Sequence, residues 1–127
     1  MLSLHLLKKI FYSGDGGYSP QFREIGDYFQ GFDLAIMENG QYNTSWAQIH
    51  MMPEEVAQAT MDLQAKMLLP VHCGKFALSP HHWQEPFERI YTASQNKSYK
   101  LLTPLLGETV FIDQNNQKFN KWWTTIS

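Results

Sequence analysis

Short apolar runs along the chain predict three strands, at residues 9–13, 33–37 and 67–72. The runs are rich in β-branched, aromatic and other large apolar side chains, which favour strands. The run at 33–37 is continuous rather than alternating, as is typical of a strand that is covered on both faces. A tail over residues 100–112, interrupted by a proline and a glycine, predicts one or two edge strands.

Apolar side chains at helical spacing predict a helix after each of the three strands. The first begins at Ser19–Pro20, where a capping hydroxyl precedes a proline, and Gly31 ends it. The second begins at Pro53, and the third spans residues 86–93. The three apolar faces consist of Phe22, Ile25 and Phe29, of Val56, Ala59 and Leu63, and of Phe87, Ile90 and Tyr91. Strands that alternate with helices build a largely parallel sheet, so the sequence predicts the α/β class.

The composition fits one domain spanning residues 1–127. The chain has 43% hydrophobic and only 17% charged residues, enough for a buried core and unlike a disordered chain. Its net charge of -2 comes without a basic block, which argues against a nucleic-acid partner. The single cysteine, Cys73, forms no internal disulfide, so we expect a cytoplasmic protein. The apolar runs are far shorter than the roughly 20 residues of a transmembrane helix.

Ligands of parallel α/β sheets gather beyond the carboxyl ends of the strands, where this chain carries Asp15, Glu38–Asn39 and His72. A carboxylate and a neutral imidazole are natural ligands for zinc, manganese or iron, so Asp15 and His72 are candidate metal ligands. Two alternatives stay open. Asp15 in its glycine-rich turn could accept backbone hydrogen bonds only, and His72 could be a buried histidine paired with an aspartate.

Two further histidines, His50 and His82, lie in predicted loops near the same edge and could donate a hydrogen bond to an oxyanion or phosphate. The alternative for each is an ordinary surface histidine. Trp46 and Trp83 in these loops could line a pocket for an apolar or lipid-like substrate. Cys73 adjoins His72 on a predicted strand, where neighbouring side chains point to opposite faces, so we interpret it as a buried structural thiol.

Four ordered strings carry a resemblance to a known family: FYSGDGGY at residues 11–18, FDLAIM at 32–37, HMMPEE at 50–55 and VHCGKFAL at 71–78. Together they resemble the second half of metallo-β-lactamase-fold hydrolases. The similarity is to the branch of N-acyl-phosphatidylethanolamine-hydrolysing phospholipase D and RomA-like proteins, and it covers roughly residues 9–108. It implies the C-terminal half of an αββα sandwich, with a mixed sheet and helices packed on it.

The resemblance also implies roles for the candidate residues. By it, Asp15 bridges two divalent metal ions, zinc above all, with manganese or iron as alternatives, and His72 completes the second metal site. His50 faces the substrate as the catalytic candidate, and His82 is a weaker candidate for substrate binding. Met52 stands where the phospholipase has an aspartate, a departure that bears on substrate contacts. The implied activity is metal-dependent hydrolysis of a phosphodiester or a related ester.

The family's His-x-His-x-Asp-His motif is absent from this sequence. Asp15 and His72 by themselves cannot hold a two-metal centre, so we expect an incomplete hydrolase that is inactive alone. The alternative is a non-catalytic truncated fragment or assembly module that keeps the fold. One bare sheet face is expected in either case, which predicts a homo-oligomer or pairing with a separate N-terminal half.

Overall fold

The computed structural model describes residues 8–13, 17–39, 51–71, 84–105, 108–112 and 117–124, which form strands alternating with helices. The elements are β1 (Ile10–Tyr12), α1 (Gln21–Phe29), β2 (Leu34–Glu38), α2 (Pro53–Asp62), β3 (Met67–Val71), α3 (Glu85–Ala93), β4 (Lys100–Leu101) and a 3-10 helix at Trp122–Thr124. The three predicted strands and three predicted helices all form. Within the described part of the tail, only β4 is a strand.

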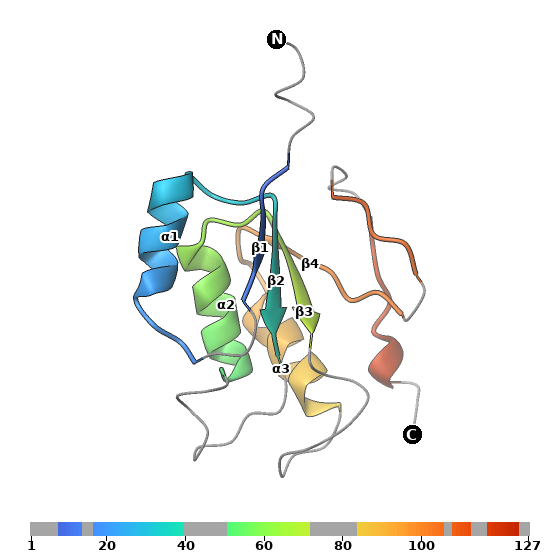
Figure 1. Ribbon diagram of the computed structural model, residues 1–127. Coiled ribbons are helices and arrows are strands. Elements are labelled where there is room, and N and C mark those ends of the chain that lie inside the picture. Colours follow the sequence, from blue (N-terminus) through green and yellow to red (C-terminus); the bar gives the residue numbers. More distant parts are fainter. Residues whose placement is uncertain are drawn as a thin grey trace.

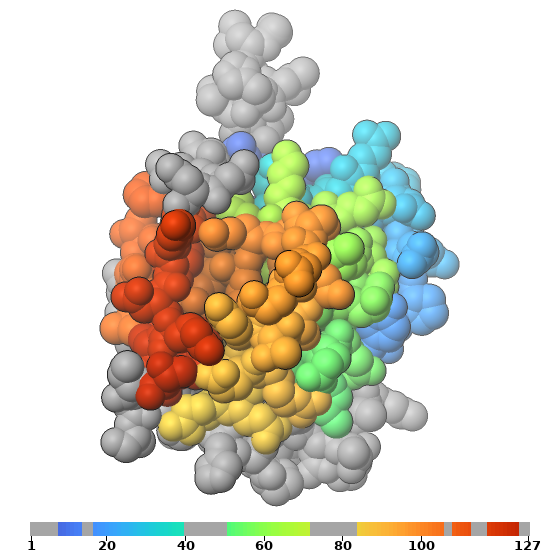
Figure 2. All heavy atoms as spheres, turned by 180° about the vertical axis from the view of Figure 1, so that it is seen from behind, coloured from blue at the N-terminus to red at the C-terminus, as the bar shows by residue number. Residues whose placement is uncertain are grey.

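The four strands form one sheet in the order β1-β2-β3-β4, and every neighbouring pair is parallel. Each connection therefore crosses over through a helix to the next strand in line. Such crossovers are right-handed, and when they all advance in the same direction they place their helices on the same face of the sheet. Figure 1 shows this arrangement, and Figure 2 shows the three helices side by side from behind, with α2 in the middle. The α/β class is confirmed.

The main core lies between the sheet and the helices. Alternate strand residues face the helices, and Ala35, Met37 and Leu68 on this face are fully buried. The helices contribute the predicted apolar positions, of which Val56, Ala59, Leu63 and Ile90 are also fully buried. The spacing of apolar residues therefore identified the packed side of α2 correctly, whereas on α1 the predicted Phe29 is 47% exposed, at the end of the helix.

The opposite face of the sheet has a smaller core. Leu34, Met67 and Leu102 are buried there, and they pack with partly buried residues of the C-terminal segment. Those residues are Val110, Ile112 and Phe119. At the other side of the same face, Ile10 and Tyr12 of β1 are 48% and 62% exposed. This face is therefore covered near β4 and open near β1.

Two glycines, one within α1 and one just after it, allow close packing and a sharp turn of the chain. Gly26 is buried against the backbone at the end of α2, where a Cβ would lie 2.3 Å from the carbonyl oxygen of Asp62. At the end of α1, Gln30 and Gly31 both have positive φ angles, of 58° and 91°. The predicted stop at Gly31 is thus a left-handed turn of the chain.

Candidate functional site

The strands β1, β2 and β3 are parallel, so their carboxyl ends meet at one edge of the sheet, which we call the carboxyl edge (Figure 1). The candidate residues Asp15, His50, His72 and His82, like Trp46, Cys73 and Trp83, lie outside the described residues. Their sequence positions relate them to this edge. Asp15 follows β1, His72 directly follows β3, and His50 and His82 each precede the helix that follows.

Glu38 is the last residue of β2, and its side chain is fully buried at the carboxyl edge. Its carboxylate Oε1 accepts the backbone N–H of Met51 at 2.7 Å. Its own N–H donates to the Oγ of Ser13, just beyond β1, at 3.1 Å. A buried carboxylate needs such hydrogen bonds because its charge has lost water. Glu38 thus links the end of β1 to the segment that leads into α2.

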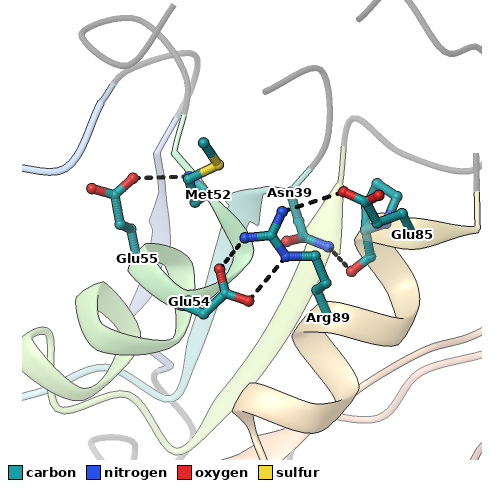
Figure 3. Close-up of polar contacts among 7 residues, drawn as sticks. Asn39, Met52, Glu54, Glu55, Glu85 and Arg89 are labelled. Carbon is teal, nitrogen blue, oxygen red and sulfur yellow. Dashed lines mark hydrogen bonds and ion pairs between the residues drawn. The ribbon is translucent and has the colours of Figure 1, made fainter. Parts of the chain in front are cut away.

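Asn39 follows Glu38 and is also fully buried. Its backbone N–H donates to the carbonyl oxygen of Val71, at the end of β3, at 2.6 Å. Its side-chain Nδ2 donates to the carbonyl oxygen of Pro86 in the first turn of α3 at 2.9 Å (Figure 3). The Oδ1 atom of Asn39 has no hydrogen-bond partner in the part of the chain that the structure describes. Asn39 therefore connects three elements and leaves one buried acceptor available.

The start of α2 is fixed by a second carboxylate. The backbone N–H of Met52, the residue before the helix, donates to Glu55 Oε1 at 2.9 Å (Figure 3). This contact is one half of a capping box, in which the side chain of the third helical residue accepts the backbone N–H of the residue before the helix. Because Glu38 binds the preceding amide, of Met51, two consecutive N–H groups bind carboxylates from two different elements.

An ion cluster joins the first turns of α2 and α3 near the same edge. Arg89 pairs with Glu54 of α2, and its Nη1 lies 3.2 Å from Oε2 of Glu85 (Figure 3). The hydrogen bonds from the Arg89 guanidinium lower the pKa of the Glu54 carboxyl, because they favour its charged form. Both side chains are partly exposed, so the cluster positions the helix starts more than it stabilises the fold.

Tyr18 closes the glycine-rich FYSGDGGY string and connects it to the helix layer. Its hydroxyl donates to Asp62 Oδ2 at 2.5 Å, and Asp62 is buried. This hydrogen bond to a carboxylate raises the pKa of Tyr18. The Asp62 carboxylate also accepts a hydrogen bond from Gln58 Nε2 at 2.9 Å. Tyr18, shortly before α1, is therefore held by the last residue of α2.

The comparison with protein families assigns the chain. The sequence profile of the β-lactamase superfamily domain matches residues 3–73, more than half of the 127 residues. The chain belongs to the β-lactamase superfamily. The matched part runs from before β1 to just beyond β3, so it contains Asp15, His50 and His72 together with the carboxyl edge.

Curated relatives agree with this membership of the β-lactamase superfamily and with the predicted branch. An uncharacterized protein of Mycobacterium tuberculosis is 38% identical over 91% of the chain and 32% of its own length. The outer membrane protein RomA of Klebsiella pneumoniae is 60% identical over 54% of the chain and 52% of its length. The mitochondrial N-acyl-phosphatidylethanolamine-hydrolyzing phospholipase D of Saccharomyces cerevisiae is 34% identical over 89% and 25%. The chain spans about a third of the length of the first of these relatives.

Solved structures support the superfamily's fold. The metallo-β-lactamase fold protein YhfI of Bacillus subtilis has a TM-score of 0.52 and 20% identity, and it covers 72% of this chain and 35% of its own. Igni18, a metallo hydrolase of Ignicoccus hospitalis, has a TM-score of 0.53 and 21% identity, over 79% and 40%. The metallo-β-lactamase fold that the resemblance implied is confirmed. All strand pairs among the described residues are parallel, so an antiparallel strand of a mixed sheet has to lie outside them.

The ligands predicted for this β-lactamase superfamily chain are a carboxylate and an imidazole, which are types that divalent metals bind. Among the described residues, no three His, Cys, Asp or Glu side chains form a group that could hold an ion. Glu38 is at the carboxyl edge, but its Oε1 already accepts the Met51 amide. The predicted ligands Asp15 and His72 lie outside the described residues, and they are two, whereas a zinc site usually takes four. Among the described helices, none is long and apolar enough to cross a membrane.

Sequence reasoning placed Glu38 and Asn39 at the carboxyl edge and gave them no role. The signal was present: two polar residues directly follow a continuous apolar strand, and polar groups at such a position have to find partners when the strand is buried. Which partners they find depends on Met51, Val71 and Pro86, which are distant in sequence. Tyr18 was likewise quoted in a string without a contact of its own.

Proposed function

We propose that this chain is part of a metal-dependent hydrolase that acts on a phosphodiester or a related ester. In this proposal Asp15 and His72 are metal ligands, His50 is the catalytic residue that faces the scissile group, and His82 contributes to substrate binding. The family membership and the metallo hydrolase among the structural neighbours support hydrolysis with a divalent metal. A small-molecule substrate of lipid-like or phosphodiester character is supported by the yeast relative's name.

One observation carries the proposal: the carboxyl ends of β1, β2 and β3 lie side by side, and the candidate residues follow or adjoin them in sequence. Glu38 and Asn39 join these ends to the starts of α2 and α3 through short hydrogen bonds. The described residues Ser13, Met51 and Val71, which lie next to or near residues 15, 50 and 72 in the sequence, thereby share a common base. A shared base is what a site built from several loops requires, because its groups have to meet within a few tenths of an ångström.

The chemistry assigned to the site needs residues beyond this chain. Divalent metals supply a hydroxide-like nucleophile at neutral pH when they are bound. In this proposal Asp15 and His72 bind the metal ions together with additional ligands. Zinc, manganese and iron all suit a carboxylate and an imidazole. His50 and His82 are to donate hydrogen bonds to the oxygen atoms on which negative charge develops. In this proposal the additional ligands come from a part of the fold that the longer relatives have and this sequence does not cover.

A second candidate is a non-catalytic fragment or assembly module that keeps the fold. The chain spans about a third of the M. tuberculosis relative, and the described residues contain no group of three metal-binding side chains. A module of this kind retains the packed helix layer and the hydrogen bonds of Glu38 and Asn39, since these stabilise the fold whether or not a metal binds.

Metal binding distinguishes the two candidates. The chain, loaded by dialysis against zinc, manganese or iron(II), is analysed for bound metal by mass spectrometry beside its Asp15→Ala and His72→Ala variants. The hydrolase proposal predicts that each substitution weakens binding by at least about tenfold, whereas His5→Ala, outside the predicted site, leaves it unchanged. Equal binding by all four proteins, or none by any, favours the non-catalytic module.

We also propose that the open side of the sheet is covered in the functional protein, by a second copy or by an N-terminal half. The exposed residues Ile10 and Tyr12 share a sheet face with the buried Leu34 and the partly buried Ile36, according to the strand register. Large exposed apolar patches mark interfaces. Light scattering after size-exclusion chromatography should give a mass above that of one chain. A stable monomer would restrict the proposal to an N-terminal half.

A further inference from the structure

The C-terminal end of α3, the start of β4 and the C-terminal segment together line a pocket of about 410 Å³. Lys100, the first residue of β4, pairs with Met67, the first residue of β3, so the pocket lies where the parallel strands begin. This amino edge of the sheet is opposite the carboxyl edge. Figure 2 shows the segment that follows α3, in orange, beside the C-terminal segment, in red. We propose that the pocket binds the phosphate group of a phosphomonoester, and this inference does not depend on the proposed function.

The charged side chains that line the pocket are all positive among the described residues. They are Lys97, Lys100 and Lys118, and the described lining contains no Asp or Glu. No carboxylate in the described part of the chain forms an ion pair with any of these three lysines. The whole sequence has ten Lys and Arg against twelve Asp and Glu, so three ammonium groups around one pocket are a local excess of positive charge. A concave surface of one sign of charge attracts ions of the opposite sign.

The kind of positive side chain favours a phosphate group over a carboxylate. A lysine ammonium acts as a point charge and is a common ligand of phosphate, whereas the planar fork of an arginine matches a carboxylate in two parallel hydrogen bonds. No arginine is among the described residues that line the pocket. A phosphomonoester carries a charge of about -1.5 to -2 at pH 7, which suits three nearby ammonium groups better than a single negative charge does.

The pocket also has room and apolar surface for the group that is esterified to the phosphate. Its volume of about 410 Å³ lies within the roughly 300–1,000 Å³ of small-molecule sites. Tyr91 and Phe119 line it together with the lysines. Phe119 is partly buried and packs against the smaller core on its other side. A ligand with a phosphate at one end and an apolar or aromatic group at the other therefore fits this lining.

The turn that carries Lys97 is held in place by a buried contact. The hydroxyl groups of Ser94 and Tyr99 lie 2.6 Å apart in a hydrogen bond, and both residues are buried. Within this turn Asn96 has a positive φ angle of 61°, a conformation that asparagine tolerates better than most residues. The backbone N–H of Lys97 donates to the carbonyl oxygen of Ser94 at 3.3 Å. The position of Lys97 is therefore set by contacts that a ligand does not have to form.

The C-terminal segment that carries Lys118 is attached to the rest of the pocket by two tryptophans. Trp122 Nε1 donates to the carbonyl oxygen of Thr103, just after β4, at 3.1 Å. Trp123 Nε1 donates to Oε2 of Glu88 on α3 at 2.6 Å. These hydrogen bonds hold the segment against both other parts of the lining. Because the charged groups are brought together before a ligand arrives, binding loses less conformational entropy.

Calorimetric titration of the full chain with phenyl phosphate, at low ionic strength and with EDTA to exclude bound metal, tests the proposal. Lys100→Gln is expected to weaken binding at least about fivefold, the effect in water of one unit charge about 4 Å away. Lys97 and Lys118 are exposed, so their Gln variants should weaken it by about twofold to fivefold. Lys100→Arg keeps the charge and should bind nearly as the wild type does. Phenyl sulfate, with one negative charge, should bind more weakly than phenyl phosphate.

The matched control is Lys8→Gln, which removes the same charge beside β1, at the other end of the sheet. The proposal is overturned if phenyl phosphate does not bind, or if Lys8→Gln weakens binding as much as Lys100→Gln does. Should Lys100→Gln not fold, the double variant Lys97→Gln/Lys118→Gln changes only exposed side chains, and an unchanged affinity there also overturns the proposal. Amide NMR signals of Asn96, Lys97 and Phe119 should shift on titration, whereas shifts confined to other residues would contradict this pocket.

Vesicles distinguish a soluble phosphomonoester from a lipid headgroup of the same chemistry. The chain is sedimented with phosphatidylcholine vesicles that contain either phosphatidic acid, whose headgroup is a phosphomonoester, or phosphatidylglycerol, whose headgroup is a phosphodiester. Binding to phosphatidic acid alone, lost in Lys100→Gln, would assign the lipid headgroup as the ligand. Binding of phenyl phosphate without binding to either vesicle would assign a soluble ligand. Equal binding to both vesicles, without binding of phenyl phosphate, would show a general attraction to negative surfaces and would overturn the proposal.

Discussion

The two faces of the sheet differ in what covers them, although the strands carry large apolar residues on both. On the helix face, Ala35, Met37 and Leu68 are completely buried under α1, α2 and α3. On the opposite face, the C-terminal segment covers the strands near β4, and Ile10 and Tyr12 of β1 remain exposed (Figure 1). The first face is closed by the chain itself, and the second is closed only in part.

This difference supports the proposal that a second copy or an N-terminal half covers the open side of the sheet. A strand such as β2, with large apolar residues on both faces, exposes apolar surface to water unless both faces are covered. Local sequence is sufficient to specify the helix face, because every covering helix follows its strand directly. Coverage of the other face near β4 depends on the C-terminal segment, which lies farther away in the sequence.

Leu68→Ala and Ile10→Ala test the comparison most strongly. Leu68 is fully buried on the helix face, so its truncation leaves a cavity and should lower the free energy of unfolding by about 3 kcal/mol. Ile10 is 48% exposed, and the corresponding loss should be below about 1 kcal/mol. Urea denaturation followed by tryptophan fluorescence measures both. Equal losses would show that the face near β1 is covered as tightly as the helix face.

Gly26→Ala tests how closed the helix layer is. The added Cβ would lie 2.3 Å from Asp62 O and 2.8 Å from Leu63 Cα, both backbone atoms, so α1 and α2 have to move apart. We expect a loss of about 2 kcal/mol, as for overpacking elsewhere. Thermal unfolding by circular dichroism measures it. A neutral result would mean that the two helices separate at no cost, and the contrast between the two faces would then be weaker than described.

The helix layer is also the part of the fold that could be predicted from sequence. Runs at 33–37 and 67–72 fixed β2 and β3 to within one residue, because a continuous apolar run between turn signals has few other solutions. The tail could not be read in this way. Of residues 100–112, only Lys100–Leu101 pairs as a strand in the described part, since edge pairing depends on β3 rather than on local propensity.

The candidate site was predictable only in part. That the residues following β1, β2 and β3 meet at one edge follows from the parallel direction of the strands, which the sequence predicts. The contacts of Glu38 with Met51 and of Asn39 with Pro86 could not be predicted, because they join residues that come together only after the helices pack. The positions of Asp15, His50, His72 and His82 lie outside the described residues, and their roles stay predictions.

Tyr18→Phe sharpens the comparison at a polar contact within the helix layer. The substitution removes the hydroxyl that donates to the buried Asp62 carboxylate and should cost about 1 kcal/mol. Because the Asp62 contact raises the pKa of Tyr18, its stabilisation is fully present below about pH 10 and is lost as pH rises through the raised pKa. Stability curves of both proteins from pH 8 to 11 measure this. Curves that stay parallel to the highest pH would contradict the assignment.

Glu54→Gln is expected to have the smallest effect, because its ion pair with Arg89 is exposed to solvent on both sides. The side chains are 54% and 34% exposed, so the loss at neutral pH should be about 0.5 kcal/mol and should shrink further in high salt. The guanidinium lowers the pKa of Glu54, so the stabilisation is present above the ordinary glutamate pKa, near pH 4, and is lost as pH falls through the lowered value. Glu24→Gln, on α1, provides the control for the loss of one negative charge. A loss for Glu54→Gln comparable with that of Leu68→Ala would mean that the helix layer is held by charges at its rim rather than by its apolar face, and the distinction between the two faces of the sheet would need a different cause.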